Sequence, residues 1–162
     1  MIHTGKLISP FLWFDQNAEE AAKFYTGFFK NSEIKSVTHY PPNGPAPEGS
    51  VMTVTFELDG QEFTGLNGGP AFKFTEAVSF VVNCETQQEI DYYWDALIEG
   101  GESSACGWLK DKYRLSWQIC PVQLYDMYTS GNSEGINRAF QAMMQMVKLD
   151  LQKLQDAFDG NS

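Results

Sequence analysis

The side chains best suited to metal binding or nucleophilic catalysis are few in this chain and lie far apart. There are two histidines, His3 and His39, and three cysteines, at positions 84, 106 and 120. No Cys-X-X-Cys pair occurs, so neither a zinc ribbon nor a disulfide framework is indicated. We therefore expect three reduced thiols and no Ser-His-Asp triad, because only these two histidines are present.

Cys106 is the candidate nucleophile among the thiols. A reactive thiol needs a neighbouring base or cation that lowers its pKa. The nearest cation in the segment is Lys110, four residues farther along an expected strand and so more than roughly 12 Å away. We therefore favour a packed, unreactive thiol at this position.

Length and composition limit the classes of protein to consider. A chain of 162 residues suits one domain, or two small modules with a shared core. Apolar residues make up 43% and aromatic residues 14%, which is enough for a proper core. The net charge of −10 disfavours nucleic acids and anionic membranes as partners, because both attract positive surfaces.

The chain also carries no recognisable targeting segment. Its N-terminus lacks a basic stretch followed by an apolar run, so we expect no secretory signal. No apolar stretch approaches the roughly 20 residues that a membrane span needs. These features predict a cytoplasmic protein.

The elements that must position any site begin with a strand and a helix. Asn17 and Glu20 have the spacing of a capping box at the start of the helix. Asp59-Gly60 is a strong hairpin signal between two alternating segments. The first part of the chain therefore predicts a strand, a helix and three strands, at residues 6–14, 17–31, 33–40, 50–58 and 61–66.

The same order of elements then starts again, which indicates an internal repeat. Thr86 and Glu89 form a second capping box, and Gly100-Gly101 ends the second helix. Around it we expect strands at residues 77–83, 102–110 and 115–120, with a turn at residues 111–114. Beyond Pro121 the apolar spacing predicts two more helices. We interpret residues 1–162 as one domain, with modules at about 5–70 and 76–121 and a helical extension at 122–160.

Four segments resemble the PhnB-like family: PFLWFDQNAEEAAKFYTGFF, SVMTVTFELDGQEFTGLNGGP, AVSFVVNCETQQEIDYYWDALIEGGE and CGWLKDKYRLSWQICP. That family carries the label 3-demethylubiquinone-9 3-methyltransferase domain. It belongs to the vicinal oxygen chelate superfamily, with glyoxalase I, bleomycin-resistance proteins and extradiol dioxygenases. The resemblance covers about residues 7–121. It implies an α+β fold in which two βαβββ modules form a curved mixed β-sheet around a cavity, the glyoxalase/bleomycin-resistance fold, here with added C-terminal helices. It also implies a homodimer.

The resemblance further implies where a divalent metal would lie. The superfamily's enzymes use four strand positions, usually filled by His and Glu. Here these positions fall at or near Ser9, Asn67, Ala77 (with Ser79 as the alternative on the same face) and Gln118. Ala77 cannot bind a metal, and neutral side-chain oxygens lack the charge to hold a transition metal against water. We therefore expect no metal and no other cofactor.

The family label would require a site for S-adenosylmethionine. That site is usually a glycine-rich loop between a parallel strand and a helix. The glycine pair Gly68-Gly69 is instead followed by Pro70 and a strand-like segment. A linker between modules is the better interpretation of this pair.

The alternation of side chains along the strands predicts a cavity with a polar floor and aromatic walls. Such a cavity suits a flat, partly polar small molecule. Residues 41–49 form a proline-rich loop that could act as a lid or contact a partner chain. The candidate lining residues are Ser9, Phe11, Trp13, Asn67, Ser79, Cys106, Trp108, Lys110 and Gln118.

One residue departs from the family pattern. Arg114 stands where a glycine is usual, in the turn before the last strand. If that turn needs a positive φ, the arginine costs roughly 1 kcal/mol. A rearranged turn would also move the position assigned to Gln118.

Three functions remain open from the sequence. The first is a metal-free small-molecule-binding protein of the superfamily. The second is a metal-dependent lyase, thiol transferase or dioxygenase, and the third is the methyltransferase of the label. The fold alone does not determine whether the protein is an enzyme or which ligand it binds.

Overall fold

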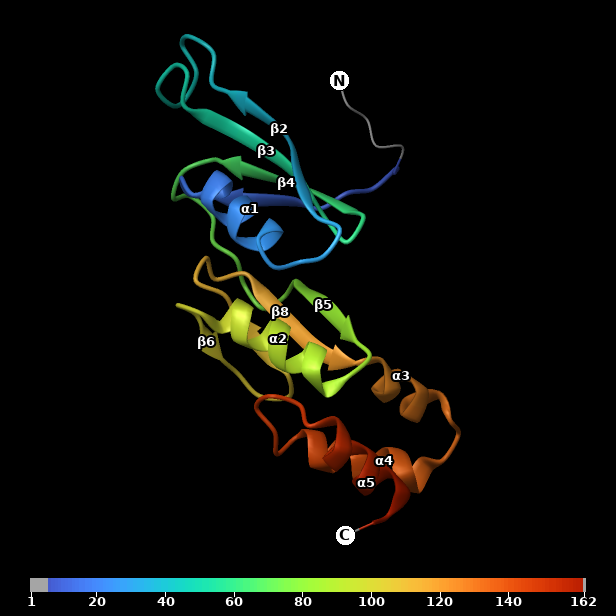
Figure 1. Ribbon diagram of the computed structural model, residues 1–162. Helices are drawn as coiled ribbons and strands as arrows, with labels where there is room; N and C mark the ends of the chain where they lie inside the picture. The colour runs from blue at the N-terminus through green and yellow to red at the C-terminus, as the bar shows by residue number, and fades with distance from the viewer. Residues whose placement is uncertain (1–5, 162) are drawn as a thin grey trace. The chain divides into compact units, whose positions relative to one another are not determined.

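The chain divides into two compact units, Met1–Lys73 and Phe74–Ser162, and a computed structural model describes residues 6–161 (Figure 1). Within these residues each unit carries one four-stranded mixed sheet with a helix between its first two strands. The predicted α+β class with two βαβββ modules and C-terminal helices is therefore confirmed. No helix in this part of the chain combines the length and hydrophobicity that a membrane span requires.

Unit 1 has the strand order β1-β4-β3-β2, with β1 parallel to β4 and the other neighbours antiparallel. The predicted hairpin at Asp59-Gly60 is confirmed, and both residues have a positive φ. The first strand starts only after Pro10, later than expected. The elements of this unit are β1 (Phe11–Phe14), α1 (Ala18–Thr26), β2 (Glu33–His39), β3 (Val51–Leu58) and β4 (Gln61–Asn67).

Helix α1 covers one face of this sheet with Ala18, Ala21, Ala22 and Tyr25, all of which are buried. The opposite face carries threonines in cross-strand pairs. Hydroxyl oxygens lie 2.5 Å apart in the pair Thr38–Thr53 and 3.4 Å apart in a second pair between β3 and β4. Unit 1 therefore has an apolar helix side and a polar open side, as expected for a half-buried sheet.

Unit 2 repeats this plan in the order β5-β8-β7-β6, with β5 parallel to β8. Its two antiparallel strands β6 and β7 are much shorter than their counterparts in unit 1. The elements are β5 (Ser79–Cys84), α2 (Gln87–Ile98), β6 (Glu102–Ser103), β7 (Trp108–Lys110), β8 (Ser116–Pro121), α3 (Val122–Thr129), α4 (Ser133–Met143) and α5 (Leu151–Asp159).

The two predicted capping boxes differ in outcome. At α2 the Thr86 hydroxyl accepts a hydrogen bond from the Glu89 amide, as expected. At α1 the Asn17 side chain makes no capping bond, so that prediction is wrong. The Ala18 amide instead donates to Asn67 Oδ1 over 2.9 Å. A residue 49 positions away in the chain caps the helix, and no local spacing rule could have identified it.

The strand predicted at residues 102–110 is a tight hairpin. Cys106 and Gly107 both have a positive φ, of 60° and 84°, and they reverse the chain between β6 and β7. The Trp108 amide donates to the Ala105 carbonyl across this turn. Because the chain reverses here, simple alternation along residues 102–110 does not hold, and Cys106 does not share a strand face with Trp108.

The C-terminal extension is part of the core of unit 2. The turn before α5 is held by Gln87 on α2, whose amide donates to the Leu149 carbonyl and accepts from the Leu151 amide. Leu149 is buried, and a Cβ added at Gly107 would lie 3.0 Å from its side chain. Helix α3, which the sequence analysis did not predict, joins β8 to this cluster.

The turn between β7 and β8 is built around a buried carboxylate. Asp111 is only 2% exposed. Its Oδ1 accepts from the amides of Tyr113 and Leu115, and its Oδ2 accepts from the indole nitrogen of Trp117 over 2.9 Å. Arg114 in this turn has a φ of 71°, so the conformation that usually favours glycine is kept.

Replacing Asp111 tests the importance of this turn. Asp111→Ala leaves three buried donors without these acceptors and should lower the free energy of unfolding by about 3 kcal/mol or more. Asp111→Asn keeps the acceptor for the two amides and loses the one for Trp117, so it should cost about 1–2 kcal/mol. Urea unfolding measures both, and a loss below about 0.5 kcal/mol for Asp111→Ala would contradict this account.

Candidate functional site

The open face of the unit 2 sheet brings polar side chains from three strands together. In the register of the sheet, Trp108 lies opposite Gln118, Lys110 lies opposite Ser116, and Ser79 lies beside Ser116 on the other side. The alternate residues of β7 and β8, such as Leu109 and Trp117, are buried on the face that α2 covers. The site residues therefore share the face away from the helix.

Hydrogen bonding on this face leaves one buried group unused. The Gln118 amide nitrogen donates to the Ser79 hydroxyl over 2.9 Å. Ser116 is 1% exposed, yet its hydroxyl oxygen has no hydrogen-bond partner among the described residues. A buried hydroxyl normally has a partner, so this oxygen is available to one that the chain itself does not provide.

The positive charge of Lys110 is balanced by neighbouring carboxylates. Its ammonium group forms an ion pair with Glu76 and lies 3.7 Å from a carboxylate oxygen of Glu102. The hydrogen bond from Lys110 is the main cause that lowers the pKa of Glu76. Arg114 lies 3.5 Å from Glu102 on the same side. Two cations therefore meet two carboxylates, and the local net charge is zero.

These groups border a small cavity of about 130 Å³. Trp108 supplies an aromatic wall, and Lys110 and Ser116 supply donors and an acceptor. Trp108 and Lys110 were predicted from the sequence to line a cavity. Ser116 was not, although it alternates with Gln118 along the same strand. The full lining is Glu76, Glu102, Ser103, Ser104, Trp108, Leu109, Lys110 and Ser116.

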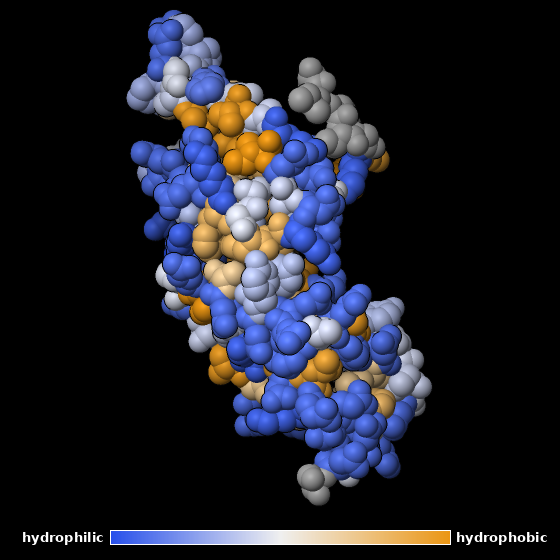
Figure 2. Space-filling model, in the orientation of Figure 1, coloured by the Kyte–Doolittle hydropathy of each residue, from blue (hydrophilic) through white to orange (hydrophobic). Residues whose placement is uncertain are grey.

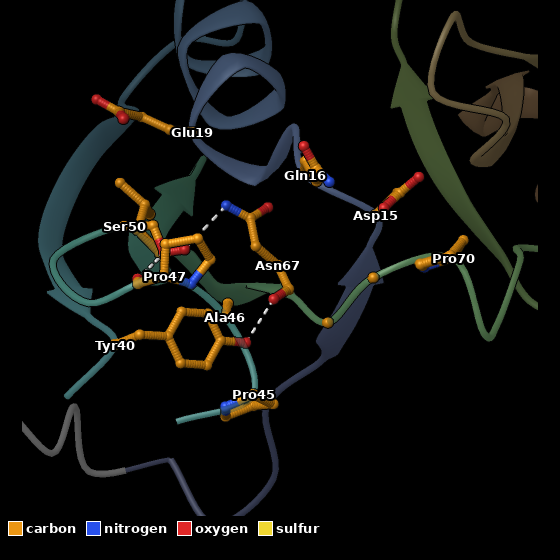
Figure 3. Close-up of a pocket in the computed structure, with 13 residues that line it drawn as sticks. Asp15, Gln16, Glu19, Tyr40, Pro45, Ala46, Pro47, Ser50, Asn67 and Pro70 are labelled. Carbon is orange, nitrogen blue, oxygen red and sulfur yellow. Dashed lines mark hydrogen bonds between the residues drawn. The ribbon is translucent and has the colours of Figure 1, made fainter. Parts of the chain in front are cut away.

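A larger cavity, of about 580 Å³, lies within unit 1 where the carboxyl ends of β1 and β4 meet (Figure 3). The proline-rich loop after β2 borders it through Pro45, Ala46 and Pro47. Figure 3 shows Tyr40 and Asn67 facing each other at its base, while the carboxylates of Asp15 and Glu19 point away from Asn67.

The polar groups at the base of this larger cavity are used by the fold. The Tyr40 hydroxyl donates to the Asn67 carbonyl over 2.6 Å, and the Asn67 amide nitrogen donates to the Val51 carbonyl. The Asn67 amide oxygen caps α1. Ser50 donates to the Pro47 carbonyl within the loop. These hydrogen bonds join the loop, the strands and helix α1, so the polar groups at the base of the cavity have a structural role.

The remaining sequence candidates of unit 1 are not brought together. Ser9 and Phe11 are exposed, at the start of the unit, whereas Asn67 lies at the far end of β4 and points to the helix side. Trp13 donates its indole hydrogen to the Gly69 carbonyl. A Cβ at Gly68 would lie 2.3 Å from the Trp13 ring, so this glycine is needed for close packing.

The described histidine and the three thiols do not gather into a metal site. Between residues 6 and 161 no three His, Cys, Asp or Glu side chains gather into a group that could hold a metal ion. His39 lies at the end of β2, and His3 lies outside the described residues. Burial raises the pKa of Cys84 to about 12 and that of Cys120 to about 11, which keeps both thiols protonated.

Comparison with known proteins places residues 6–120 in a single family model, described as 3-demethylubiquinone-9 3-methyltransferase. A solved PhnB protein from Bacillus cereus, described as a candidate 3-demethylubiquinone-9 3-methyltransferase, is 41% identical. The match covers 72% of this chain and 100% of that one, with a TM-score of 0.66.

Two more distant structures share the fold. Protein PA1353 from Pseudomonas aeruginosa is 18% identical, with 72% of this chain and 98% of that chain covered and a TM-score of 0.60. The fosfomycin resistance protein FosX from Listeria monocytogenes is 15% identical, with 76% and 97% covered and a TM-score of 0.53. No curated protein matches the sequence.

The structural role of Asn67 is testable. Asn67→Ala removes the cap of α1 and the bond to Val51, and should lower the free energy of unfolding by about 2–3 kcal/mol. Asn83→Ala, at an exposed position on β5, is the control and should change it by less than about 0.5 kcal/mol. Equal urea midpoints for the two variants would show that the hydrogen bonds of the Asn67 side chain do not stabilise unit 1.

Proposed function

The chain belongs to the 3-demethylubiquinone-9 3-methyltransferase family, and we propose that within it the protein binds a small organic molecule on the open sheet face of unit 2, without a divalent metal. The observation that carries the proposal is the buried Ser116 hydroxyl without a partner, at the wall of a cavity that Trp108 and Lys110 also border. A ligand hydroxyl or carbonyl would satisfy this group.

The size and charge of the cavity favour a neutral ring-shaped group. Its volume of about 130 Å³ is close to that of an engineered cavity of about 150 Å³ that binds benzene. Trp108 offers a ring against which a flat group can pack. Because Lys110 is paired with Glu76, an anionic group would have to displace a carboxylate. We therefore favour a phenol-like or quinone-like group.

The side chains on this face do not suit a divalent metal. Ser79 and Gln118 are neutral and bond to each other, and the nearby carboxylates of Glu76 and Glu102 are already ion-paired with Lys110. The metal enzymes of the superfamily rely on imidazole and carboxylate ligands. We therefore propose that the ligand binds here without a metal.

The methyltransferase description in the family name has no matching cofactor loop. In each unit the segment between the first strand and the following helix contains no glycine: it is Asp15-Gln16-Asn17 in unit 1 and Glu85-Thr86 in unit 2. Gly68 and Gly69 bond instead to the carbonyls of Phe14 and Asp15. These described segments do not fit the glycine-rich loop that usually holds S-adenosylmethionine.

A homodimer and a cytoplasmic location stay predictions.

Phenol and benzene form a matched pair of probes for the cavity. We expect Ser116→Ala to weaken phenol binding by about tenfold and to leave benzene binding unchanged. Only phenol has a hydroxyl group that can form a hydrogen bond with Ser116, and the variant removes that bond. Ligand-observed NMR titration measures both. Ser50→Ala, at the unit 1 cavity, is the control and should bind both probes as the parent protein does.

Two results would overturn the proposal. One is phenol binding of equal strength in the parent protein and in Ser116→Ala. The other is a rise in melting temperature with Zn²⁺ or Mn²⁺ that Gln118→Ala abolishes, because this would place a divalent metal at the same face.

A further inference from the structure

Among the described residues that border the cavity beside Ser116, Lys110 is the one cation, and two carboxylates compete for it. The side chain of Lys110 is 21% exposed, whereas those of Glu76 and Glu102 are 60% and 58% exposed. The ammonium group is therefore the most buried charge at the cavity. A carboxylate that leaves it would pass into solvent, and Lys110 would stay beside the ligand.

The two carboxylates are not equivalent. The Lys110 ammonium group donates a hydrogen bond to Glu76, and this bond is the main cause that lowers the pKa of Glu76, followed by a bond from the backbone amide of Glu76 itself. Glu102 lies 3.7 Å from Lys110 and 3.5 Å from the guanidinium group of Arg114. Glu102 is therefore shared between two cations, whereas Glu76 is the main partner of Lys110.

Glu76 reaches the cavity from outside the sheet. It lies in the turn before β5, near the start of unit 2. The Thr75 hydroxyl and carbonyl hold this turn by accepting from the amides of Ala77 and Val78, over 3.4 and 3.5 Å. The strand pairing of β5 begins only at Ser79. Replacing the carboxylate of Glu76 should therefore leave the sheet intact.

The charges around the cavity disfavour an anionic ligand. Two carboxylates and one ammonium group border it, which is an excess of one negative charge. An anion would add a second negative charge and would have to break the pair between Lys110 and Glu76. The net charge of −10 acts in the same direction, and hydrophilic side chains cover most of the surface in view in Figure 2. A neutral ligand meets neither obstacle.

We infer, on the premise of the proposed function that the cavity beside Ser116 binds a small organic molecule, that Glu76 determines the charge of the ligand that is accepted. By holding the Lys110 ammonium group, the Glu76 carboxylate excludes aromatic carboxylates and admits neutral aromatic molecules of the same shape. Loss of the Glu76 charge leaves Lys110 and Arg114 against Glu102 alone, with an excess of one positive charge. The cavity should then accept a carboxylate.

Benzoate and benzamide are matched probes, because they have nearly the same shape and only benzoate is charged at neutral pH. Ligand-observed NMR titration at low ionic strength measures the affinity of both. We expect the parent protein to bind benzamide at least about tenfold more tightly than benzoate. In Glu76→Gln, benzoate binding should strengthen by at least about tenfold, and benzamide binding should stay as it is in the parent.

Glu102→Gln is the matched control, because it removes the same charge beside the same cation and leaves Glu76 on Lys110. It should keep the preference of the parent for benzamide. Adding Lys110→Gln to Glu76→Gln should abolish the gain in benzoate binding, and circular dichroism checks that every variant is folded. The inference is overturned if Glu76→Gln binds benzoate no more tightly than the parent, or if Glu102→Gln gains as much.

Benzamide binding distinguishes failure of this inference from failure of the proposed function. If the parent binds benzamide and Glu76→Gln gains no affinity for benzoate, Glu76 does not select the charge of the ligand, but the small-molecule site stands. If neither probe binds to the parent or to Glu76→Gln, both proposals are wrong.

Discussion

The geometry of the proposed site depends on one buried carboxylate, Asp111. The three acceptor contacts of Asp111 fix the turn between β7 and β8, and the turn fixes which residues of the two strands lie opposite each other. That register sets Trp108 against Gln118 and Lys110 against Ser116. A slip by one residue would exchange the open face with the face under α2. Since β7 has only three residues, its own ladder offers little resistance to such a slip.

The C-terminal extension provides the second support of this region. Strands β6 and β7 are short, and the hairpin between them gains two backbone hydrogen bonds from residues 146 and 147. Gln87 anchors the same segment to the start of α2. Unit 1 needs no such addition, because β2 and β3 are long and pair along most of their length.

Elements governed by short-range rules were predictable from the sequence, whereas long-range contacts were not. The Asp59-Gly60 hairpin and the Thr86 cap follow from local chemistry, and the structure has both. Asn67 was expected on the floor of a cavity, and it borders the cavity of unit 1. Its side-chain oxygen also caps a helix whose first residue lies far away in the sequence, which no local pattern indicated. The turn at Cys106 resembled a continuous strand because cysteine rarely adopts a positive φ, and only the docked extension reveals why it does so here. Strand alternation predicted that Trp108 and Lys110 share one face of the sheet, and they do. Alternation gave no reason to single out Ser116, because its importance comes from a buried hydroxyl without a hydrogen-bond partner.

The central claim is that the open face of unit 2 receives the ligand, and the four indole N–H signals of the protein report on it directly. Trp108 lies on that face, Trp117 is bonded to Asp111 beneath it, Trp13 is bonded to Gly69 in unit 1, and Trp94 is buried on α2. A titration with phenol, followed in a nitrogen–proton correlation spectrum with the signals assigned by single Trp→Phe variants, distinguishes these environments. The account predicts that the Trp108 signal moves first and furthest while those of Trp13 and Trp94 stay in place. Movement of the Trp13 signal alone, or of none of the four, would contradict it.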